Sequence, residues 1–482
     1  MRGATAAAMT LGVVLPLALA RAVPGQDGSA AARQHMPAVQ EPTKPSSVIP
    51  AVIFTAAPVY RSLAALRGRE RFPQGAKLMV RRAGRQEPLV PNFTASADAN
   101  ISFDGKTVLF AGKRNAGDSW QIWKVPVDGG VPQLVYGGHG DAIRPLWLSD
   151  GRIVFAERGS EGFELMTTAL DGSSTLRLSY LPGNFIPDDV LEDGRVLFES
   201  GFPLGTGGTP EIVLVYPDGS GVESVRCDHG NAEKAGGREH GRQVQLDSGA
   251  ASAGDIVFAQ GGRLARVTSA LAGEVPIAAP PEEYAGEIAE LPDGRWLLAM
   301  RRPGEKHDEL AAWKPGTKAV QTIAQDGNRD LVEPAVVAPR AVPRTFPSAL
   351  HPWRTGNLLA LDARLSREGD LEQVPAMVRV ETQGARGEAI VLGTAPVMPD
   401  GSFFVKVPGD APLRFILQNA AARTLRQEQG WFWMRSGEQR VCVGCHTGPE
   451  RAPENRVPEV LLRTTTPVDL SGAARANAGG GR

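Results

Sequence analysis

Two cysteines and a histidine near the carboxyl end carry the strongest chemical signal in the sequence. They are Cys442, Cys445 and His446, in the order Cys-Val-Gly-Cys-His. This spacing is typical of c-type haem attachment. Two thiols three positions apart can reach the two vinyl groups on one edge of a porphyrin, and the adjacent imidazole then lies under the iron. We therefore expect one covalent haem c on Cys442 and Cys445, with His446 as an axial iron ligand.

Two other roles for this motif are less favoured. A structural zinc site usually has four ligands, often from two cysteine pairs, and the sequence holds only 3 cysteines. A thioredoxin-like redox pair requires a βαβ setting, whereas the residues around Cys442 have a loop-like pattern. So few cysteines also exclude a disulfide framework.

The second axial position of the iron is left open by the sequence. His229, His351 and Met434 are candidate distal ligands. A five-coordinate iron that binds small molecules is the alternative. The run 431–433, Trp-Phe-Trp, predicts either an apolar wall beside the porphyrin or ordinary core packing.

Composition limits both the fold and the partners. The chain has 482 residues, of which 42% are hydrophobic, which is enough for two or three domains. The chain has 52 Lys and Arg residues and 53 Asp and Glu residues, which gives a net charge of −1. We therefore expect no general electrostatic attraction to nucleic acid. The 56 Gly and 38 Pro residues favour short strands and tight turns over long helices. We therefore expect an all-β fold.

A pattern of one turn and one strand recurs through much of the chain. Each copy has Asp-Gly, a basic residue and an apolar run, and copies begin at Asp104, Asp150, Asp193 and Asp293, with a reversed copy at Gly254. Asp-Gly before an apolar run predicts a hairpin, because glycine accepts the positive φ of the turn. A period of about 45 residues with several strands is typical of propeller blades. We predict a β-propeller of about six blades over residues 47–335, and its repeats resemble those of TolB-like propellers.

The sequence that leads to the haem motif alternates like strands and carries a family resemblance. The runs 399–403 (Pro-Asp-Gly-Ser-Phe), 431–433 (Trp-Phe-Trp) and 437–440 (Gly-Glu-Gln-Arg), followed by 442–446, resemble the middle domain of the hydrazine synthase alpha subunit and its relatives. The resemblance covers about residues 340–462 and implies a β-rich domain that ends in a haem-binding segment. It also implies the same domain order, with a propeller first.

Two features depart from the family pattern. The alpha subunit continues into a further domain with a second haem, whereas this chain stops soon after Arg463. The alpha subunit also has a tyrosine iron ligand shortly after its motif, whereas here Thr447 follows and the last tyrosine is Tyr284. The resemblance therefore supports haem binding more strongly than hydrazine chemistry.

The third cysteine, Cys227, has no cysteine partner once the other two hold haem. In the family, a propeller cysteine near the haem takes part in a zinc site. The resemblance therefore implies that Cys227 could hold zinc together with His229 or the motif imidazole, and zinc accepts such ligands. The alternative is a polar loop whose thiol has no role in a site.

The first residues predict export. Arg2 precedes a short apolar stretch and two small-x-small cleavage candidates, which together predict a signal peptide over 1–22. The apolar run is shorter than the about 20 residues that span a bilayer, so we expect no membrane span after cleavage and a periplasmic or otherwise exported protein. Residues 23–46 have the composition of a flexible linker, and residues 463–482 that of a disordered tail.

Three functions fit these features. The first is an exported protein that transfers electrons through its haem to a redox partner protein. The second is a redox enzyme that acts on small nitrogen compounds, as small-molecule substrates, at an open iron. The third is a propeller binding module with a structural haem. One haem with no visible catalytic base favours the first, and the sequence leaves open whether the protein is an oxidoreductase.

Overall fold

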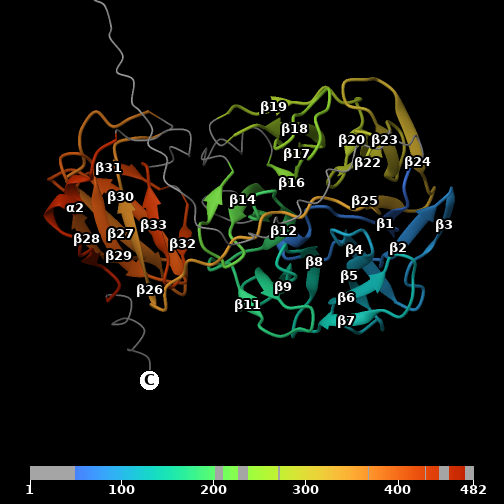
Figure 1. Cartoon of the computed structure of the whole chain (residues 1–482), viewed down its shortest axis with the longest axis horizontal. Coiled ribbons are helices and arrows are strands. Elements are labelled where there is room, and N and C mark those ends of the chain that lie inside the picture. Colours follow the sequence, from blue (N-terminus) through green and yellow to red (C-terminus); the bar gives the residue numbers. More distant parts are fainter. Residues whose placement is uncertain are drawn as a thin grey trace, which may run out of the picture. The chain divides into compact units, whose positions relative to one another are not determined.

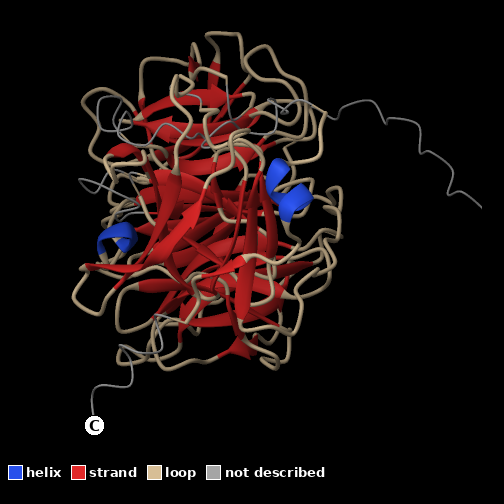
Figure 2. Cartoon of the chain, turned by 90° about the vertical axis from the view of Figure 1, so that its left-hand side faces the viewer, coloured by secondary structure: helices blue, strands red, loops and turns tan. Residues whose placement is uncertain are grey.

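The computed structural model describes residues 49–200, 210–225, 237–269, 272–366, 369–428, 430–444 and 455–472. The signal peptide predicted over 1–22 and the linker over 23–46 lie outside these residues, as do Cys227, His229, Cys445 and His446. Nearly all of the regular structure is strand, as Figure 2 shows. The described helices are η1 (Ala65–Arg67) and α2 (Glu459–Arg463), and neither is long and apolar enough to cross a membrane.

Six antiparallel sheets, which we call blades 1 to 6, form the propeller within the described residues (Figure 1). Their strands follow, from the innermost outward. Blade 1 has β25 (Asp330–Val336), β1 (Val52–Ala57), β2 (Lys77–Arg82) and β3 (Arg85–Pro88). Blade 2 has β4 (Ala95–Ile101), β5 (Thr107–Lys113), β6 (Gln121–Pro126) and β7 (Gln133–Tyr136). Blade 3 has β8 (Ala142–Trp147), β9 (Ile153–Arg158), β10 (Phe163–Thr168) and β11 (Leu176–Arg177).

The second half of the ring has the same plan. Blade 4 has β12 (Phe185–Val190), β13 (Val196–Ser200), β14 (Glu211–Val215) and β15 (Glu223–Ser224). Blade 5 has β16 (Glu239–Gln243), β17 (Ile256–Gln260), β18 (Arg263–Val267) and β19 (Val275–Pro276). Blade 6 has a split inner strand, β20 (Glu283–Tyr284) and β21 (Ala289–Glu290), then β22 (Trp296–Arg301), β23 (Glu309–Trp313) and β24 (Val320–Ala324).

Strands from both ends of the propeller sequence close the ring. In blade 1, β25 pairs antiparallel with β1, from Val336 opposite Val52 to Asp330 opposite Ala57. This explains why the first unit lacks an Asp-Gly turn before β1, since its inner strand comes from the far end of the propeller sequence. The inner strands contact their neighbours, for example β25 against β4 and β4 against β8. The expected all-β propeller of six blades is confirmed.

The Asp-Gly turns lie where the sequence predicts them, between the first and second strands of their blades. Gly151 and Gly194, in two of these turns, have φ angles of 84° and 88°. A side chain would strain this left-handed backbone, which glycine adopts freely. The preceding aspartates accept hydrogen bonds from the backbone N–H groups of Arg152 and Arg195, both at 3.0 Å. Such Asx turns are fixed by local residues alone, which is why they can be read from sequence.

Two sheets form the domain that follows the propeller. The first has, in order, β33 (Gln439–Cys442), β26 (Thr355–Ala360), β29 (Phe403–Pro408) and β34 (Val468–Asp469). The second has β28 (Ala389–Pro396), β27 (Met377–Gln383), β30 (Ala411–Gln418) and β31 (Thr424–Gln427), with β32 (Phe432–Met434) also paired to β30. Buried residues of both sheets share one hydrophobic core, among them Leu358, Val380 and Val405. The predicted β-rich domain is confirmed. Within the predicted disordered tail over 463–482, the structure describes ordered residues up to 472: β34 pairs parallel with β29, and Leu470 lies in the shared core.

Candidate functional site

The first cysteine of the haem motif is held by the sheet of the second domain. Cys442 is the last residue of β33, which runs parallel to β26 and places Cys442 opposite Ala360. Its carbonyl accepts a hydrogen bond from the N–H of Leu361 at 2.9 Å, and the carbonyl of Val443 accepts one from Asp362 at 3.2 Å. The chain is therefore fixed up to the residue after Cys442. The structure does not describe Cys445 and His446.

The glycine between the two cysteines is required by a close approach of the backbone. A Cβ on Gly444 would lie 2.7 Å from Cβ of Leu365 and 3.0 Å from the carbonyl oxygen of Asp362. Contacts below 3.0 Å are not tolerated without a backbone shift, so the motif turns tightly against the loop after β26.

The thiol of Cys442 lies at the edge of the domain core. It is half-buried, in no disulfide among the described residues, and borders the same hydrophobic cluster as Phe432 and Leu371. Burial raises the pKa of the Cys442 thiol to about 11. The sulfur is therefore a neutral thiol at physiological pH, next to apolar side chains.

The Trp-Phe-Trp run is used mainly for packing between the second domain and the propeller. Trp433 is fully buried and lies in one cluster with Phe185 and Val222 of blade 4. Its ring meets Phe185 edge-to-face with 6.2 Å between centroids. Phe432 borders both this cluster and the core around Cys442. For Trp433, the core-packing interpretation of the sequence is therefore the one that the structure supports.

β33, which carries Cys442, and the residue before it form hydrogen bonds with residues that precede Cys227 in the chain. The carboxylate of Glu438 accepts a hydrogen bond from the N–H of Gly221 at 3.2 Å, and Arg440 donates one to the carbonyl of Val222 at 3.4 Å. Cys227 follows Val222 by five positions, and five residues span at most about 18 Å. The structure does not describe Cys227 and His229. The residues that lie beside β33 are Gly221 and Val222, which precede them in the chain.

Two of the candidate distal ligands lie within the described residues. Met434 is fully buried in the core of the second domain, where its Cε would lie 2.9 Å from a Cβ built on Gly356. Met434 would have to leave this core to reach an iron. His351 is exposed and stacks on Trp353 with 4.6 Å between ring centroids. The N–H of His351 donates to the carbonyl of Gly437 at 3.0 Å, which places it beside the segment that enters β33.

A second chemically dense region lies at the centre of the propeller. In every blade the innermost strand is interrupted or its pairing register shifts, and a titratable side chain occupies that position. All six of these side chains are buried: Asp98, Arg144, Asp188, His240, Glu287 and Glu333. Four of them have a positive φ, between 54° and 62°, at Asp98, Arg144, His240 and Glu333. Bulges of this kind re-aim side chains, and left-handed backbone at non-glycine residues is concentrated at functional sites.

Ion pairs connect these central residues. Arg71, from the loop after β1, pairs with Asp98 and with Glu333, both at 2.6 Å. Arg144 pairs with Glu287 at 2.6 Å and with Asp188 at 3.2 Å. Burial alone would raise the pKa of Glu287, but Arg144 and the other cations around it lower that pKa to about 2. Glu287 is thus a fixed carboxylate.

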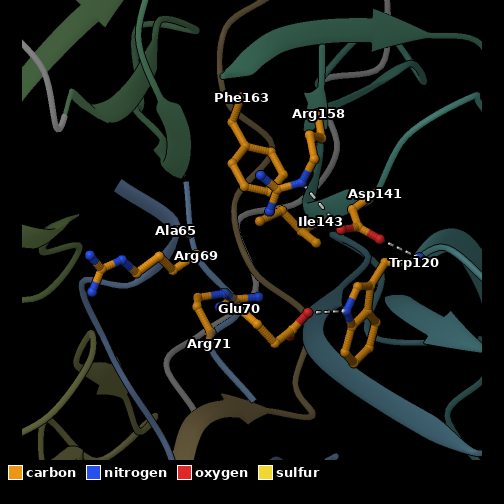
Figure 3. A pocket seen from close by; sticks show the side chains of 9 residues that line it. All are labelled: Ala65, Arg69, Glu70, Arg71, Trp120, Asp141, Ile143, Arg158 and Phe163. Atoms are coloured by element: carbon orange, nitrogen blue, oxygen red, sulfur yellow. Dashed lines mark hydrogen bonds and ion pairs between the residues drawn. The ribbon is translucent and has the colours of Figure 1, made fainter. Parts of the chain in front are cut away.

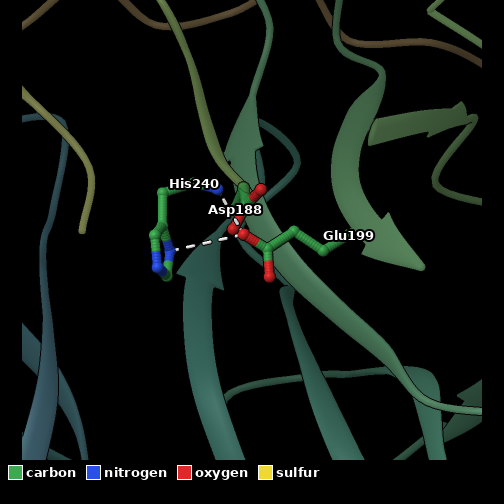
Figure 4. A group of neighbouring side chains, drawn as sticks. All are labelled: Asp188, Glu199 and His240. Atoms are coloured by element: carbon green, nitrogen blue, oxygen red, sulfur yellow. Dashed lines mark hydrogen bonds and ion pairs between the residues drawn. The ribbon is translucent and has the colours of Figure 1, made fainter. Parts of the chain in front are cut away.

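Asp188, Glu199 and His240 form a distinct group within this centre (Figure 4). Asp188 is on β12, Glu199 on β13, and His240 on β16 of the next blade. Burial raises the pKa of Glu199 to about 8, and burial with the nearby charge of Arg144 lowers the pKa of His240 to about 3. In the absence of a bound cation, the imidazole is therefore neutral and Glu199 holds its proton at pH 7.

A small cavity also borders Arg71, and several of the polar side chains that line it are paired with one another (Figure 3). The indole of Trp120 donates to Glu70 at 3.4 Å, and its backbone N–H donates to Asp141 at 3.0 Å. Arg158 pairs with Asp141 at 3.3 Å and lies over the ring of Phe163. These contacts make the cavity wall a connected polar network between blades 2 and 3.

The central titratable residues were not predicted from the sequence, although their spacing from the Asp-Gly turns gives a weak signal for them. Asp98, Arg144 and Glu287 each stand six positions before the aspartate of an Asp-Gly turn, at Asp104, Asp150 and Asp293. A charge that recurs at one position of an otherwise apolar inner strand points to the propeller axis.

Comparisons with known proteins agree with this architecture. Residues 366–447 match the family model of the hydrazine synthase alpha subunit middle domain. The structure resembles hydrazine synthase from Kuenenia stuttgartiensis, with a TM-score of 0.72 and 17% identity, over 86% of this chain and 71% of that one. It also aligns with TolB from Acinetobacter baumannii, with a TM-score of 0.41 and 13% identity, over 60% of this chain and 67% of that one. No curated protein matches the sequence significantly.

These findings define the class of protein. It is a β-propeller protein whose following β-rich domain matches the hydrazine synthase alpha middle domain over 366–447. Residues 366–447 are thus related to that middle domain, as the resemblance implies. The matched range includes the whole Cys-Val-Gly-Cys-His motif, from Cys442 to His446.

Proposed function

We propose that this protein is an exported c-type haem protein that transfers electrons through one haem. The haem is bound covalently to Cys442 and Cys445, with His446 on the iron. The position of Cys442 carries the proposal. It ends a strand inside the segment that matches the family model, with its thiol at the edge of an apolar core. We place the propeller over 47–335 and the haem domain over 340–462.

The described residues around Cys442 suit a porphyrin. A thioether requires a thiol that is not already in a disulfide, and within the described part of the chain Cys442 is in none. Phe432 and Leu371 border the same core and would keep water from the porphyrin edge. The tight backbone approach at Gly444 turns the chain immediately after Cys442 and limits where the second thiol can lie. A haem bound here would supply one-electron exchange between ferric and ferrous iron.

Zinc at Cys227, with His229 or the motif imidazole, is a second part of the proposal. The support is a pair of hydrogen bonds, from Gly221 to Glu438 and from Arg440 to Val222. They hold the described residues that precede Cys227 in the chain beside β33. Substituting Cys227→Ala should remove one bound zinc and perturb the haem spectrum. Full zinc retention with an unchanged spectrum would leave Cys227 as a loop thiol.

A redox enzyme for small nitrogen compounds is the second candidate. The observation in its favour is the burial of Met434, which takes one candidate distal ligand away from the iron. In this case the haem-loaded protein would show a high-spin iron that binds nitric oxide or hydroxylamine. Among the described candidate distal ligands, His351 is exposed. Its substitution by Ala would therefore distinguish the electron-transfer function from the enzyme function.

Absorption spectroscopy with a redox titration tests the main proposal. The full chain, matured with haem in the periplasm, should show a six-coordinate low-spin spectrum and a reversible one-electron transition. Recovery in the periplasmic fraction would support export. A haem that stays silent to physiological reductants would contradict electron transfer and favour a structural role.

A further inference from the structure

Asp188, Glu199 and His240 offer a set of ligand atoms at the spacing of a metal site. One carboxylate oxygen of each acid and one imidazole nitrogen all lie within 4.8 Å of one another. The three residues are only 1%, 2% and 6% exposed. Donor atoms on a single ion, each about 2.0–2.2 Å from it, lie within this separation. The ligands come from two blades, so the propeller fold itself brings them together.

His240 is the residue that points to a missing ligand. Among the described residues, neither of its ring nitrogens has a hydrogen-bond partner, although the side chain is buried. Nδ1 lies 3.3 Å from an oxygen of Glu199, as Figure 4 shows, but this contact lacks hydrogen-bond geometry. A buried polar group without a partner destabilises the folded state. A metal ion would use the free lone pair of the imidazole.

The two carboxylates, in contrast, are oriented by the backbone. Asp188 accepts a hydrogen bond from the N–H of Gly241 at 3.0 Å, and Glu199 accepts one from the N–H of His240. Each carboxylate oxygen has a further lone pair for a cation. Such outer hydrogen bonds are typical of ligating carboxylates, because they fix the direction of the donor oxygens.

The carboxyl groups of the centre outnumber its guanidinium groups. The described central network contains two guanidinium groups and five carboxyl groups: Arg71 and Arg144 against Asp98, Asp188, Glu199, Glu287 and Glu333. Arg144 lies near Asp188, but Glu287 binds it more closely, at 2.6 Å against 3.2 Å. Arg242, nearby, is paired with Asp189.

We propose that Asp188, Glu199 and His240 bind a divalent transition-metal ion of the zinc type at the propeller axis. The imidazole nitrogen favours zinc or a similar ion over calcium, whose ligands are oxygens. A small cavity borders the three side chains, and it is lined further by Ser62, Ile186 and the guanidinium groups of Arg71 and Arg144. This site uses other residues than the haem motif and the zinc proposed at Cys227.

Metal analysis of the full chain tests this site. All variants are made in a Cys227→Ala background, so that the other proposed zinc site is absent. Each is stripped with chelator, loaded with Zn²⁺ alone, dialysed, and analysed for zinc per chain by mass spectrometry. The background protein and a matched His307→Gln control should retain one equivalent, and Glu199→Gln and His240→Gln should retain none. His307 suits the control because it pairs with Asp330 at 3.1 Å, away from the group. Equal zinc in Glu199→Gln and in the control would overturn the proposal.

A measurement on unsubstituted protein covers the case in which these variants do not fold. Crystals of the zinc-loaded full chain should give an anomalous difference peak at the zinc edge between the three side chains. Absence of a peak there would overturn the proposal. Haem content is read separately from the same sample, so failure of the haem proposal would not affect this result.

Discussion

The indole Nε1 of Trp433 donates a 2.8 Å hydrogen bond to the backbone carbonyl of Gly219, in the turn that follows β14 of the propeller. Arg435 donates to the carbonyl of Asp218 in the same turn, at 2.5 Å. The chain then continues through Glu438 and Arg440, which also contact this turn region, into Cys442. The position of Cys442, the first cysteine of the predicted haem motif, relative to blade 4 is therefore set by side chains that lead directly into the motif.

Loss of Trp433 should weaken the whole protein. Trp433→Ala removes a fully buried indole and leaves the carbonyl of Gly219 without its partner. We expect the free energy of unfolding to fall by about 3–5 kcal/mol, as is usual for large-to-small core changes. Urea unfolding followed by circular dichroism measures this. Trp353→Ala is the matched control, because Trp353 is 49% exposed. Equal stability of the two variants would contradict the packing described here.

Gly444→Ala should impair haem attachment. The added methyl group would collide with Leu365 and Asp362 and displace the segment between the two cysteines. We expect the ratio of haem to protein to fall several-fold in a chain matured with haem. Gly327→Ala is the control, since a Cβ there meets nothing within 4 Å. A haem content of Gly444→Ala equal to that of the control would show that the motif does not need the close approach.

Local chemistry explains what the sequence could predict. The Asp-Gly turns at Asp150 and Asp193 depend only on neighbouring residues, so the blades and their approximate period are visible in the sequence. The pairing of Val52 with Val336 joins distant parts of the chain, and no local pattern encodes it. For Trp433, the aromatic pattern alone could not decide between a cofactor wall and a core, because both require a buried apolar ring.

The same limit applies to the candidate metal site. Its ligands come from β12, β13 and β16, and only the ring of blades brings them together. Cys442, in contrast, belongs to a motif whose ligand spacing is local, so the haem prediction needed no knowledge of the fold.

The central ion pairs should matter more than exposed ones. Arg71→Met would leave the buried carboxylate of Asp98 without its cation, and would leave Glu333 with only its longer pair to Arg144 at 3.8 Å. Removing one partner from a buried ion pair costs about 3–5 kcal/mol, and we expect that loss in the free energy of unfolding. Arg82→Met is the control, because its partner Glu87 is 70% exposed, and such pairs contribute about 0–1 kcal/mol. Similar losses in both variants would argue against a tightly coupled centre.

Asp308 should make stability depend on pH. Burial, together with the nearby charge of Asp330, raises the pKa of Asp308 from 3.8 to about 6. The folded state therefore favours the protonated acid, and this stabilisation is complete below pH 3.8 and is lost as the pH rises through about 6. The loss is about 3 kcal/mol at 1.36 kcal/mol per pKa unit.

Asp308→Asn, which mimics the protonated acid, isolates this effect. Its unfolding free energy relative to the unsubstituted protein should increase by about 3 kcal/mol between pH 4 and pH 8. Asp128→Asn, at a position 92% exposed, controls for removal of a carboxylate. A constant difference across this pH range would contradict the predicted shift.

The most direct test of the account is the intact mass of the full chain, expressed with periplasmic haem maturation and denatured before analysis. The account predicts the mass of the polypeptide, after signal cleavage, plus one haem. It also predicts that Cys442→Ala combined with Cys445→Ala abolishes the addition, whereas Cys227→Ala retains it. An unmodified mass for the unsubstituted protein under these conditions would contradict the proposal that Cys442 anchors a haem.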